Sequence, residues 1–123
     1  LMPYMVNKFN IRVYGIWLKD NKILMSNENI EGFKMLKLPG GGLEYGEGPV
    51  ECVIREFQEE LDVSIEVSRL VHTTETFIPS AFKKHEQVIA IHYLVTSNDA
   101  IASMESTQPT RLGGENYHMF EWC

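Results

Sequence analysis

The strongest pattern along the chain is an apolar stripe at helical spacing between residues 49 and 61. Its members recur every three or four positions, which places them on one face of an α-helix. They are Val50, Val53, Ile54, Phe57 and Leu61. Pro49 suits the first helical turn, where a backbone N–H would have no partner, and Gly48 can serve as the N-cap. We therefore predict a helix that packs on a core through this stripe.

Strand patterns lie on both sides of the predicted helix. Residues 9–18 carry apolar side chains on both faces, as in a strand buried on two sides, and the turn signal Asp20-Asn21 predicts a hairpin. The predicted strands are residues 9–18, 23–25, 35–38, 64–78, 87–96 and 117–122. Polar segments predict loops at residues 27–34, 79–84 and 97–111. This order indicates an α/β fold with a mixed β-sheet and helices on its faces.

The composition narrows the class of protein. The chain has 123 residues, of which 44% are hydrophobic, and this suits a single domain with a substantial core. The net charge of −6 argues against a nucleic-acid backbone or an anionic membrane as the main partner. No apolar run reaches the roughly 18 residues that a membrane-spanning helix needs. Two cysteines, Cys52 and Cys123, make no disulfide framework, so we expect a reduced, cytoplasmic compartment.

Three glutamates gather on a second face of the predicted helix. Glu56, Glu59 and Glu60 lie at positions i, i+3 and i+4, where like charges repel one another unless a cation lies between them. Carboxylate oxygens suit Mg²⁺ or Mn²⁺, which are often bound together with substrate phosphates. Glycines at positions 40, 41, 42, 46 and 48 form a loop that lets the backbone approach a ligand closely. An acidic helix face alone is usually solvated surface, but a glycine loop leading into it favours a metal site beside a pyrophosphate.

This stretch resembles the signature of a known enzyme family. The pattern G-x5-E-x7-R-E-U-x-E-E-x-G-U, in which U is a bulky apolar residue, is the Nudix box. The matching residues are Gly41, Glu47, Arg55, Glu56, Phe57, Glu59, Glu60 and Val63. Asp62 departs from the pattern, because the family has a helix-ending glycine there, yet Asp tolerates the left-handed conformation better than most residues. The chain is thus similar to Nudix hydrolases of the MutT-like kind, which implies their α/β/α sandwich.

The resemblance also implies a metal site, with Mg²⁺ or Mn²⁺ as the cofactor. The implied ligands are the carbonyl of Gly40 and the carboxylates of Glu56, Glu59 and Glu60. Glu47 and Arg55 would pair and hold the glycine loop against the helix, so they would support the chemistry rather than perform it. The backbone of Gly41 and Gly42 would lie against the phosphate chain of the substrate.

The sequence leaves open which residue is the catalytic base and which compound is the substrate. Members of the family use a box glutamate, here Glu59, or a glutamate from a late loop, for which Glu115 is the candidate and Glu44 a weaker one. The resemblance implies cleavage of the pyrophosphate linkage of ADP-ribose, a nucleotide sugar or a nucleoside triphosphate. Pro79, which lies 16 residues beyond Val63, shifts the odds slightly towards ADP-ribose. The alternative is a non-catalytic Nudix module that senses a ligand, although such modules typically lose box glutamates that are present here.

We expect residues 1–123 to form one Nudix domain. Domains of this family usually continue from the last strand into a second long helix, so we expect the sequence to lack that helix. The expected partner is a small nucleoside di- or triphosphate derivative, not a nucleic acid or a membrane. The sequence does not decide between a monomer and a homodimer.

Overall fold

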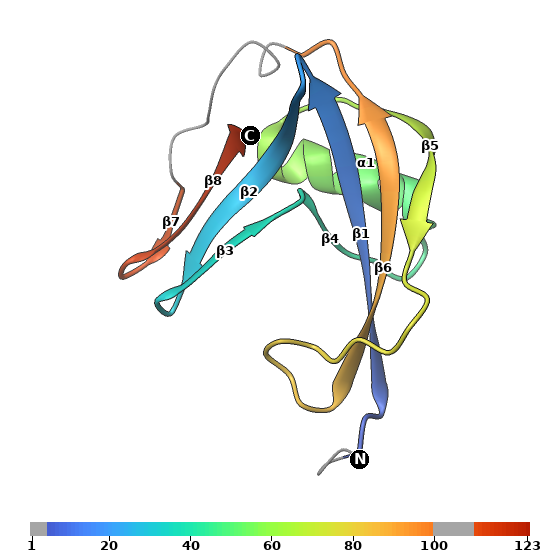
Figure 1. Ribbon diagram of the computed structural model, residues 1–123, viewed down its shortest axis with the longest axis vertical. Coiled ribbons are helices and arrows are strands. Elements are labelled where there is room, and N and C mark those ends of the chain that lie inside the picture. The colour runs from blue at the N-terminus through green and yellow to red at the C-terminus, as the bar shows by residue number, and fades with distance from the viewer. Residues whose placement is uncertain (1–4, 100–109) are drawn as a thin grey trace.

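A mixed β-sheet that divides into two wings carries the fold (Figure 1). The computed structural model describes residues 5–99 and 110–123, and these contain eight strands and one helix. In chain order the elements are β1 Lys8–Lys19, β2 Lys22–Ile30, β3 Phe33–Lys37, β4 Gly40–Gly42, α1 Pro49–Leu61, β5 Glu66–Thr73, β6 Glu86–Thr96, β7 Thr110–Gly113 and β8 Asn116–Trp122. Strands β1 and β6 are parallel, whereas their neighbours pair antiparallel. The predicted mixed sheet is confirmed.

The two wings meet at the end of the β1–β2 hairpin. The first wing has the strand order β5-β6-β1-β4 and the second has the order β3-β2-β8-β7. Strands β1 and β2 pair at Leu18↔Ile23 and Lys19↔Lys22, beside the predicted turn at residues 20 and 21. Beyond that point β1 pairs with β4 and β2 pairs with β3. The wings therefore diverge, as Figure 1 shows, and α1 packs between them.

Helix α1 begins and ends where the sequence predicts. Gly48 is the N-cap and Pro49 is the first helical residue. Asp62 takes the left-handed conformation, with φ 54° and ψ 42°, and its backbone N–H donates to the carbonyl of Gln58 at 3.1 Å. Asp62 thus adopts the conformation that the family's glycine would adopt, and the helix ends at this residue without a glycine.

The buried face of α1 is rotated from the predicted stripe. Cys52, Val53 and Phe57 are buried, whereas Val50 and Ile54 are 41% and 38% exposed. The prediction was wrong at the two exposed residues because it placed the stripe without Cys52, which packs as a small apolar side chain. The helix therefore directs a narrower strip toward the sheet.

The second wing corrects two predictions about loops. Strand β2 extends to Ile30, and a two-residue turn of Glu31 and Gly32, with φ of 52° and 78°, leads directly into β3. The polar loop predicted at residues 27–34 is therefore wrong. Two polar residues of β2, Ser26 and Glu28, line a polar cavity. The glycines at residues 40–42 likewise form strand β4 rather than part of a loop.

The first wing corrects the length of one strand. Strand β5 ends at Thr73, short of the predicted end at residue 78. After it, an isolated bridge pairs Pro79 with Gln87 beside the start of β6. The predicted polar segment 97–111 lies mostly outside the described residues, and Thr110 and Arg111 at its end belong to β7.

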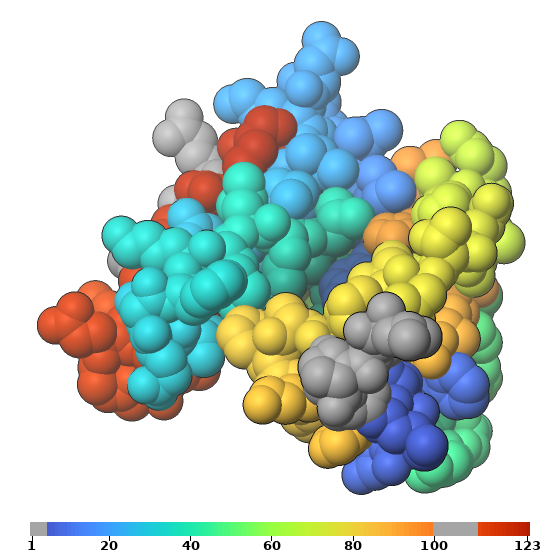
Figure 2. Space-filling view, turned by 60° about the horizontal axis from the view of Figure 1, so that its bottom comes forward, coloured from blue at the N-terminus to red at the C-terminus, as the bar shows by residue number. Residues whose placement is uncertain are grey.

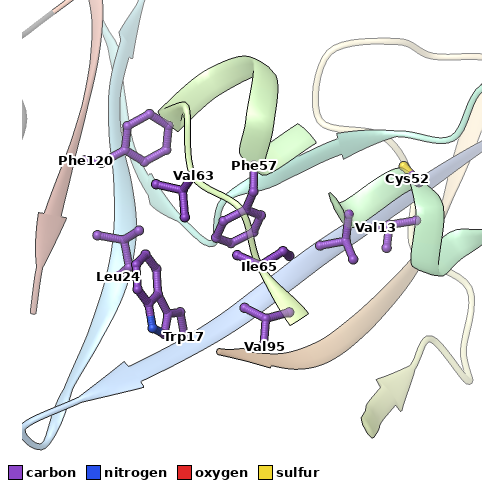
Figure 3. Close-up of a cluster of buried hydrophobic side chains, with 10 residues drawn as sticks. Val13, Trp17, Leu24, Cys52, Phe57, Val63, Ile65, Val95 and Phe120 are labelled. Atoms are coloured by element: carbon purple, nitrogen blue, oxygen red, sulfur yellow. The ribbon is translucent and has the colours of Figure 1, made fainter. Parts of the chain in front are cut away.

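One hydrophobic cluster joins α1 to both wings (Figure 3). Val13 and Trp17 of β1 and Val95 of β6 contribute from the first wing, and Leu24 and Phe120 contribute from the second. The ring of Trp17 packs edge-on against Trp122, with ring centroids 5.0 Å apart. This cluster fixes the helix and its carboxylates relative to both wings. In the described part of the chain, no helix is long and apolar enough to cross a membrane.

Gly15 sets the distance between β1 and α1, and this generates a stability prediction. A Cβ atom at this position would come within 2.5 Å of the Phe57 ring and 3.3 Å of Val53. Gly15→Ala should therefore lower the free energy of unfolding by about 1–3 kcal/mol through overpacking. Urea denaturation measures this change. Adding Phe57→Leu should recover part of the loss, and a Gly15→Ala variant that unfolds at the parent's urea concentration would contradict the packing.

Candidate active site

The short strand β4 consists of three glycines, so its backbone can lie against the helix with no side chain between them. It pairs antiparallel with β1 through Arg12↔Gly42, Val13↔Gly41 and Tyr14↔Gly40. A Cβ atom on Gly41 would meet the Glu56 carboxylate at 2.4–2.5 Å. At Gly40, φ is +152° and a Cβ atom would overlap the Val13 carbonyl oxygen. Glycine is therefore required at Gly41 for the helix carboxylate to lie on the strand, and at Gly40 for the strand to lie against β1.

The guanidinium of Arg55 ties this strand, the following loop and the helix together. Its Nε and Nη2 donate to the two carboxylate oxygens of Glu47 at 3.0 and 2.7 Å. Nη2 also donates to the Gly42 carbonyl oxygen at 3.1 Å. Only 13% of the Glu47 side chain is exposed, and the hydrogen bonds from Arg55 lower the pKa of Glu47 to about 2. Such bidentate pairing in a partly shielded position is the strong form of an ion pair.

Three further carboxylates surround the same guanidinium. Nη1 of Arg55 lies 3.0 Å from Glu56, 3.0 Å from Glu59 and 3.5 Å from Glu44. The Glu56 side chain is 12% exposed, whereas those of Glu59 and Glu44 are 57% and 65% exposed. The shielded contacts with Glu47 and Glu56 thus hold the site, because exposed pairs contribute little.

Glu56 and Glu60 face a polar cavity of about 260 Å³. The cavity is lined by Arg12, Ser26, Glu28, Lys37, residues 38–42, Glu56, Glu60 and His118. Glu60 is an exposed residue overall. Desolvation of its carboxyl group and a hydrogen bond with Glu56 nevertheless raise the pKa of Glu60 to about 8. Two carboxyl groups that lie this close together, where the charged form of one is disfavoured, mark a place where a cation is favoured.

The cavity contains residues that the sequence did not single out. Glu28 of β2 accepts a hydrogen bond from Ser26 Oγ at 2.7 Å and pairs with Lys37 Nζ at 3.3 Å. Arg12 of β1 and His118 of β8 also line the cavity. Glu28 was missed because its segment was assigned to a loop. The alternation of β2 would have placed it on the same face as Leu24 and the rest of the inward side chains.

Other predicted site residues lie elsewhere. Glu59 is turned toward Arg55 and does not line the cavity. Glu115, in the turn between β7 and β8, accepts a hydrogen bond from Asn29 Nδ2 through its carbonyl and lines separate cavities at that hairpin. The structure therefore brings Glu56 and Glu60 together but not Glu115. Glu51, in the first turn of α1, accepts a hydrogen bond from the Gly48 backbone N–H at 2.8 Å.

The donor set fits a divalent cation that is shared with a substrate. In residues 5–99 and 110–123, no three side chains of His, Cys, Asp or Glu gather closely enough to hold a metal ion by themselves. Mg²⁺, however, is usually held by one or two carboxylates while phosphates and water complete its shell. Glu56 and Glu60 on a polar cavity, beside the bare backbone of β4, provide that arrangement.

Comparison with known proteins places the chain in one family. The family model of the NUDIX domain matches residues 8–123. An ADP-ribose pyrophosphatase from Methanocaldococcus jannaschii is 42% identical over 62 residues, which are 50% of this chain and 37% of that protein. This similarity therefore spans well under half of the relative.

Solved structures show the same fold. A UDP-X diphosphatase is similar over 97% of this chain and 52% of its own, with a TM-score of 0.65 and 20% identity. A MutT NUDIX hydrolase from Burkholderia pseudomallei is similar over 94% of this chain and 83% of its own, with a TM-score of 0.68 and 20% identity. The chain thus spans about half the length of the first of these structures. The predicted fold class, the Nudix-type α/β/α sandwich, is confirmed.

The hydrogen bonds from Arg55 to Glu47 and Gly42, which we call the Arg55 clasp, generate a second prediction. Arg55→Ala removes the hydrogen bonds to Glu47 and Gly42, so it should lower the free energy of unfolding by about 2 kcal/mol. Arg55→Lys should recover only part of this loss, because an ammonium group cannot form the paired contact. Urea denaturation of both variants checks the order. A parent-like midpoint for Arg55→Ala would show that the clasp does not support the fold.

The lowered pKa of Glu47 predicts a dependence on pH. The folded pKa is about 2 and the ordinary value is 4.5, so the ionised carboxylate stabilises the fold above pH 4.5 and this stabilisation is lost as the pH falls through 2. Glu47→Gln should therefore melt below the parent at pH 7 and close to it near pH 2. Glu44→Gln, which removes the exposed pair, is the matched control and should change little. A Glu47→Gln deficit that stayed constant with pH would contradict the assignment.

Proposed function

This chain belongs to the NUDIX domain family, and we propose that it is a metal-dependent hydrolase that cleaves the pyrophosphate linkage of a nucleoside diphosphate derivative. One observation carries the proposal: two neighbouring carboxylates, Glu56 and Glu60, face a cavity whose wall is the side-chain-free backbone of β4. This combination supports the binding of a divalent cation and a phosphate chain at the same place.

Glu56 and Glu60 would hold Mg²⁺ or Mn²⁺, with the Gly40 carbonyl as a further ligand. When bound, the cation supplies positive charge that neutralises the phosphates and favours attack by water. Arg55 holds Glu56 in place through the 3.0 Å contact and thereby orients it toward the cavity. Glu47 orients Arg55 in turn, so both residues act as positioning residues.

The cavity also supplies cations of its own. Arg12 and Lys37 line it from β1 and β3. Both can contact phosphate oxygens, and the backbone of Gly41 and Gly42 allows the phosphate chain to approach closely. The cationic side chains would favour a diphosphate over an uncharged ligand.

A carboxylate is also needed to take the proton of the attacking water. Glu59 is engaged by Arg55 outside the cavity, and Glu115 lines other cavities. We therefore assign this task to Glu28, which is shielded and held by Ser26 and Lys37 within the cavity. A base must lie within hydrogen-bond reach of the water in the bound complex.

The names of two similar proteins support one substrate class. Their names specify ADP-ribose and a UDP derivative, both of which are nucleoside diphosphates linked to a second group. Water attack within the pyrophosphate would release a nucleoside monophosphate and a phosphorylated second group. A nucleoside triphosphate, which would give the monophosphate and pyrophosphate, stays as the second substrate class, since the same cavity groups would bind it.

A substrate panel in ¹⁸O-water tests the function. ADP-ribose, UDP-sugars and nucleoside triphosphates should be hydrolysed with Mg²⁺, and the label should appear in a product of pyrophosphate cleavage. Monophosphate esters should be poor substrates, because they offer no second phosphate to the cation and the cavity cations. Binding of nucleotides without any hydrolysis would instead support the non-catalytic sensing module.

A matched pair of variants tests the metal ligands. Glu60→Gln removes a carboxyl group from the cavity, whereas Glu59→Gln makes the same substitution one position away and outside the cavity. Since even residues that only orient metal ligands cost about 10- to 100-fold, Glu60→Gln should lower Mn²⁺ affinity and kcat/KM by about 100-fold or more. Glu59→Gln should lower both by much less. Equal losses in the two variants would contradict the assignment of Glu60.

A further inference from the structure

Two exposed aromatic rings, one from each wing, contact each other. Phe33 begins β3 in the second wing, and Phe82 lies in the loop between β5 and β6 of the first wing. Their ring centroids are 5.8 Å apart and the rings are nearly perpendicular, at 79°. Phe33 is nonetheless 59% exposed and Phe82 is 62% exposed. The contact therefore leaves most of both rings open to solvent.

The backbone that carries each ring is constrained, by a tight turn at Phe33 and by backbone hydrogen bonds at the base of the Phe82 loop. Phe33 follows directly after the two-residue turn of Glu31 and Gly32. The loop that carries Phe82 is closed at its base, where Ser80 N–H donates to the Glu86 carbonyl at 3.0 Å and Val88 N–H donates to the Ile78 carbonyl at 2.8 Å. A ligand that binds to rings held in this way loses little affinity to ordering of the protein.

Strand β3 links these rings to the proposed active site. Phe33 and Lys37 lie on the same face of β3 by alternation, and Lys37 lines the cavity with Glu56 and Glu60. Four residues of strand span about 13 Å, which is comparable to the reach from the base to the pyrophosphate of an extended nucleoside diphosphate. Figure 2 shows a hollow on this side, between β3 in cyan and the segment around residues 75–85 in yellow and gold.

We propose that Phe33 and Phe82 form a platform for the planar base of the substrate, which stacks on the face of one ring and contacts the other ring at its edge, while its pyrophosphate lies in the cavity at Glu56 and Glu60. This inference rests on the proposed function and specifies how that site selects its substrate class. Aromatic rings stack on any nucleobase, because every base has a π-face. The platform therefore selects nucleoside diphosphates over diphosphates that lack a base, without choosing between adenine and uracil.

Single substitutions test the platform through substrates with and without a base. Phe33→Ala and Phe82→Ala should both raise KM for ADP-ribose, and the one that removes the stacking face should do so by about tenfold, the effect of losing one base–aromatic stack, with little change in kcat. A base-free sugar diphosphate should be hydrolysed as by the parent. Phe9→Ala is the matched control, since Phe9 is 69% exposed and lies on the opposite face of β1 from Arg12.

A second readout keeps the test independent of turnover. The affinity of ADP, measured by calorimetry with Mg²⁺, should fall in both variants, by about tenfold in the one that removes the stacking face, and should not fall in Phe9→Ala. If the parent hydrolyses no diphosphate, the proposed function fails, but this ADP measurement still decides the platform. Equal losses for base-containing and base-free substrates would show that the rings only hold the wings together, and unchanged KM and ADP affinity would show no stacking; either result overturns the platform.

Discussion

The candidate site depends on one guanidinium held between a helix and a glycine strand. Arg55 projects from α1 and binds the Glu47 carboxylate with two nitrogens, while it also reaches the backbone carbonyl of Gly42. Because the same group contacts Glu56, the position of that carboxylate relative to β4 is set by the clasp. The glycines make this possible, since a side chain on Gly41 would displace the Glu56 carboxylate. The residues proposed to bind the cation and the residues that hold them in place therefore belong to one stretch of the chain, residues 40–60.

The parts that sequence could predict are those that local chemistry determines. The helix from Pro49 to Leu61 follows from residues close together in the chain, whereas the left-handed Asp62 and the pairing of Glu47 with Arg55 were implied by the family resemblance. The hairpin at residues 20 and 21 follows, like the helix, from residues close together in the chain. The family signature added the fold class, because its spacing fixes a loop and a helix that occur together in that fold.

The parts that sequence could not predict are those that two distant segments create. Glu28 becomes a cavity residue only because β2 lies opposite α1, and its polar sequence resembled a loop. Glu115 was a candidate base by resemblance to the family, but the β7–β8 hairpin carries it to cavities separate from the one that Glu56 and Glu60 line. The contact between Phe33 and Phe82 likewise depends on how the wings are set relative to one another, which no pattern along the chain specifies.

The central claim is that Glu56 and Glu60 hold a divalent cation against the glycine strand. Crystals grown with Mn²⁺ and a non-hydrolysable nucleoside diphosphate, measured for anomalous scattering at the manganese edge, test it most directly. The account predicts an anomalous peak about 2.1–2.2 Å from oxygens of Glu56 and Glu60, in contact with the phosphates. A peak on Glu59 and Glu44 instead, or phosphates bound in the cavity with no manganese beside them, would contradict it.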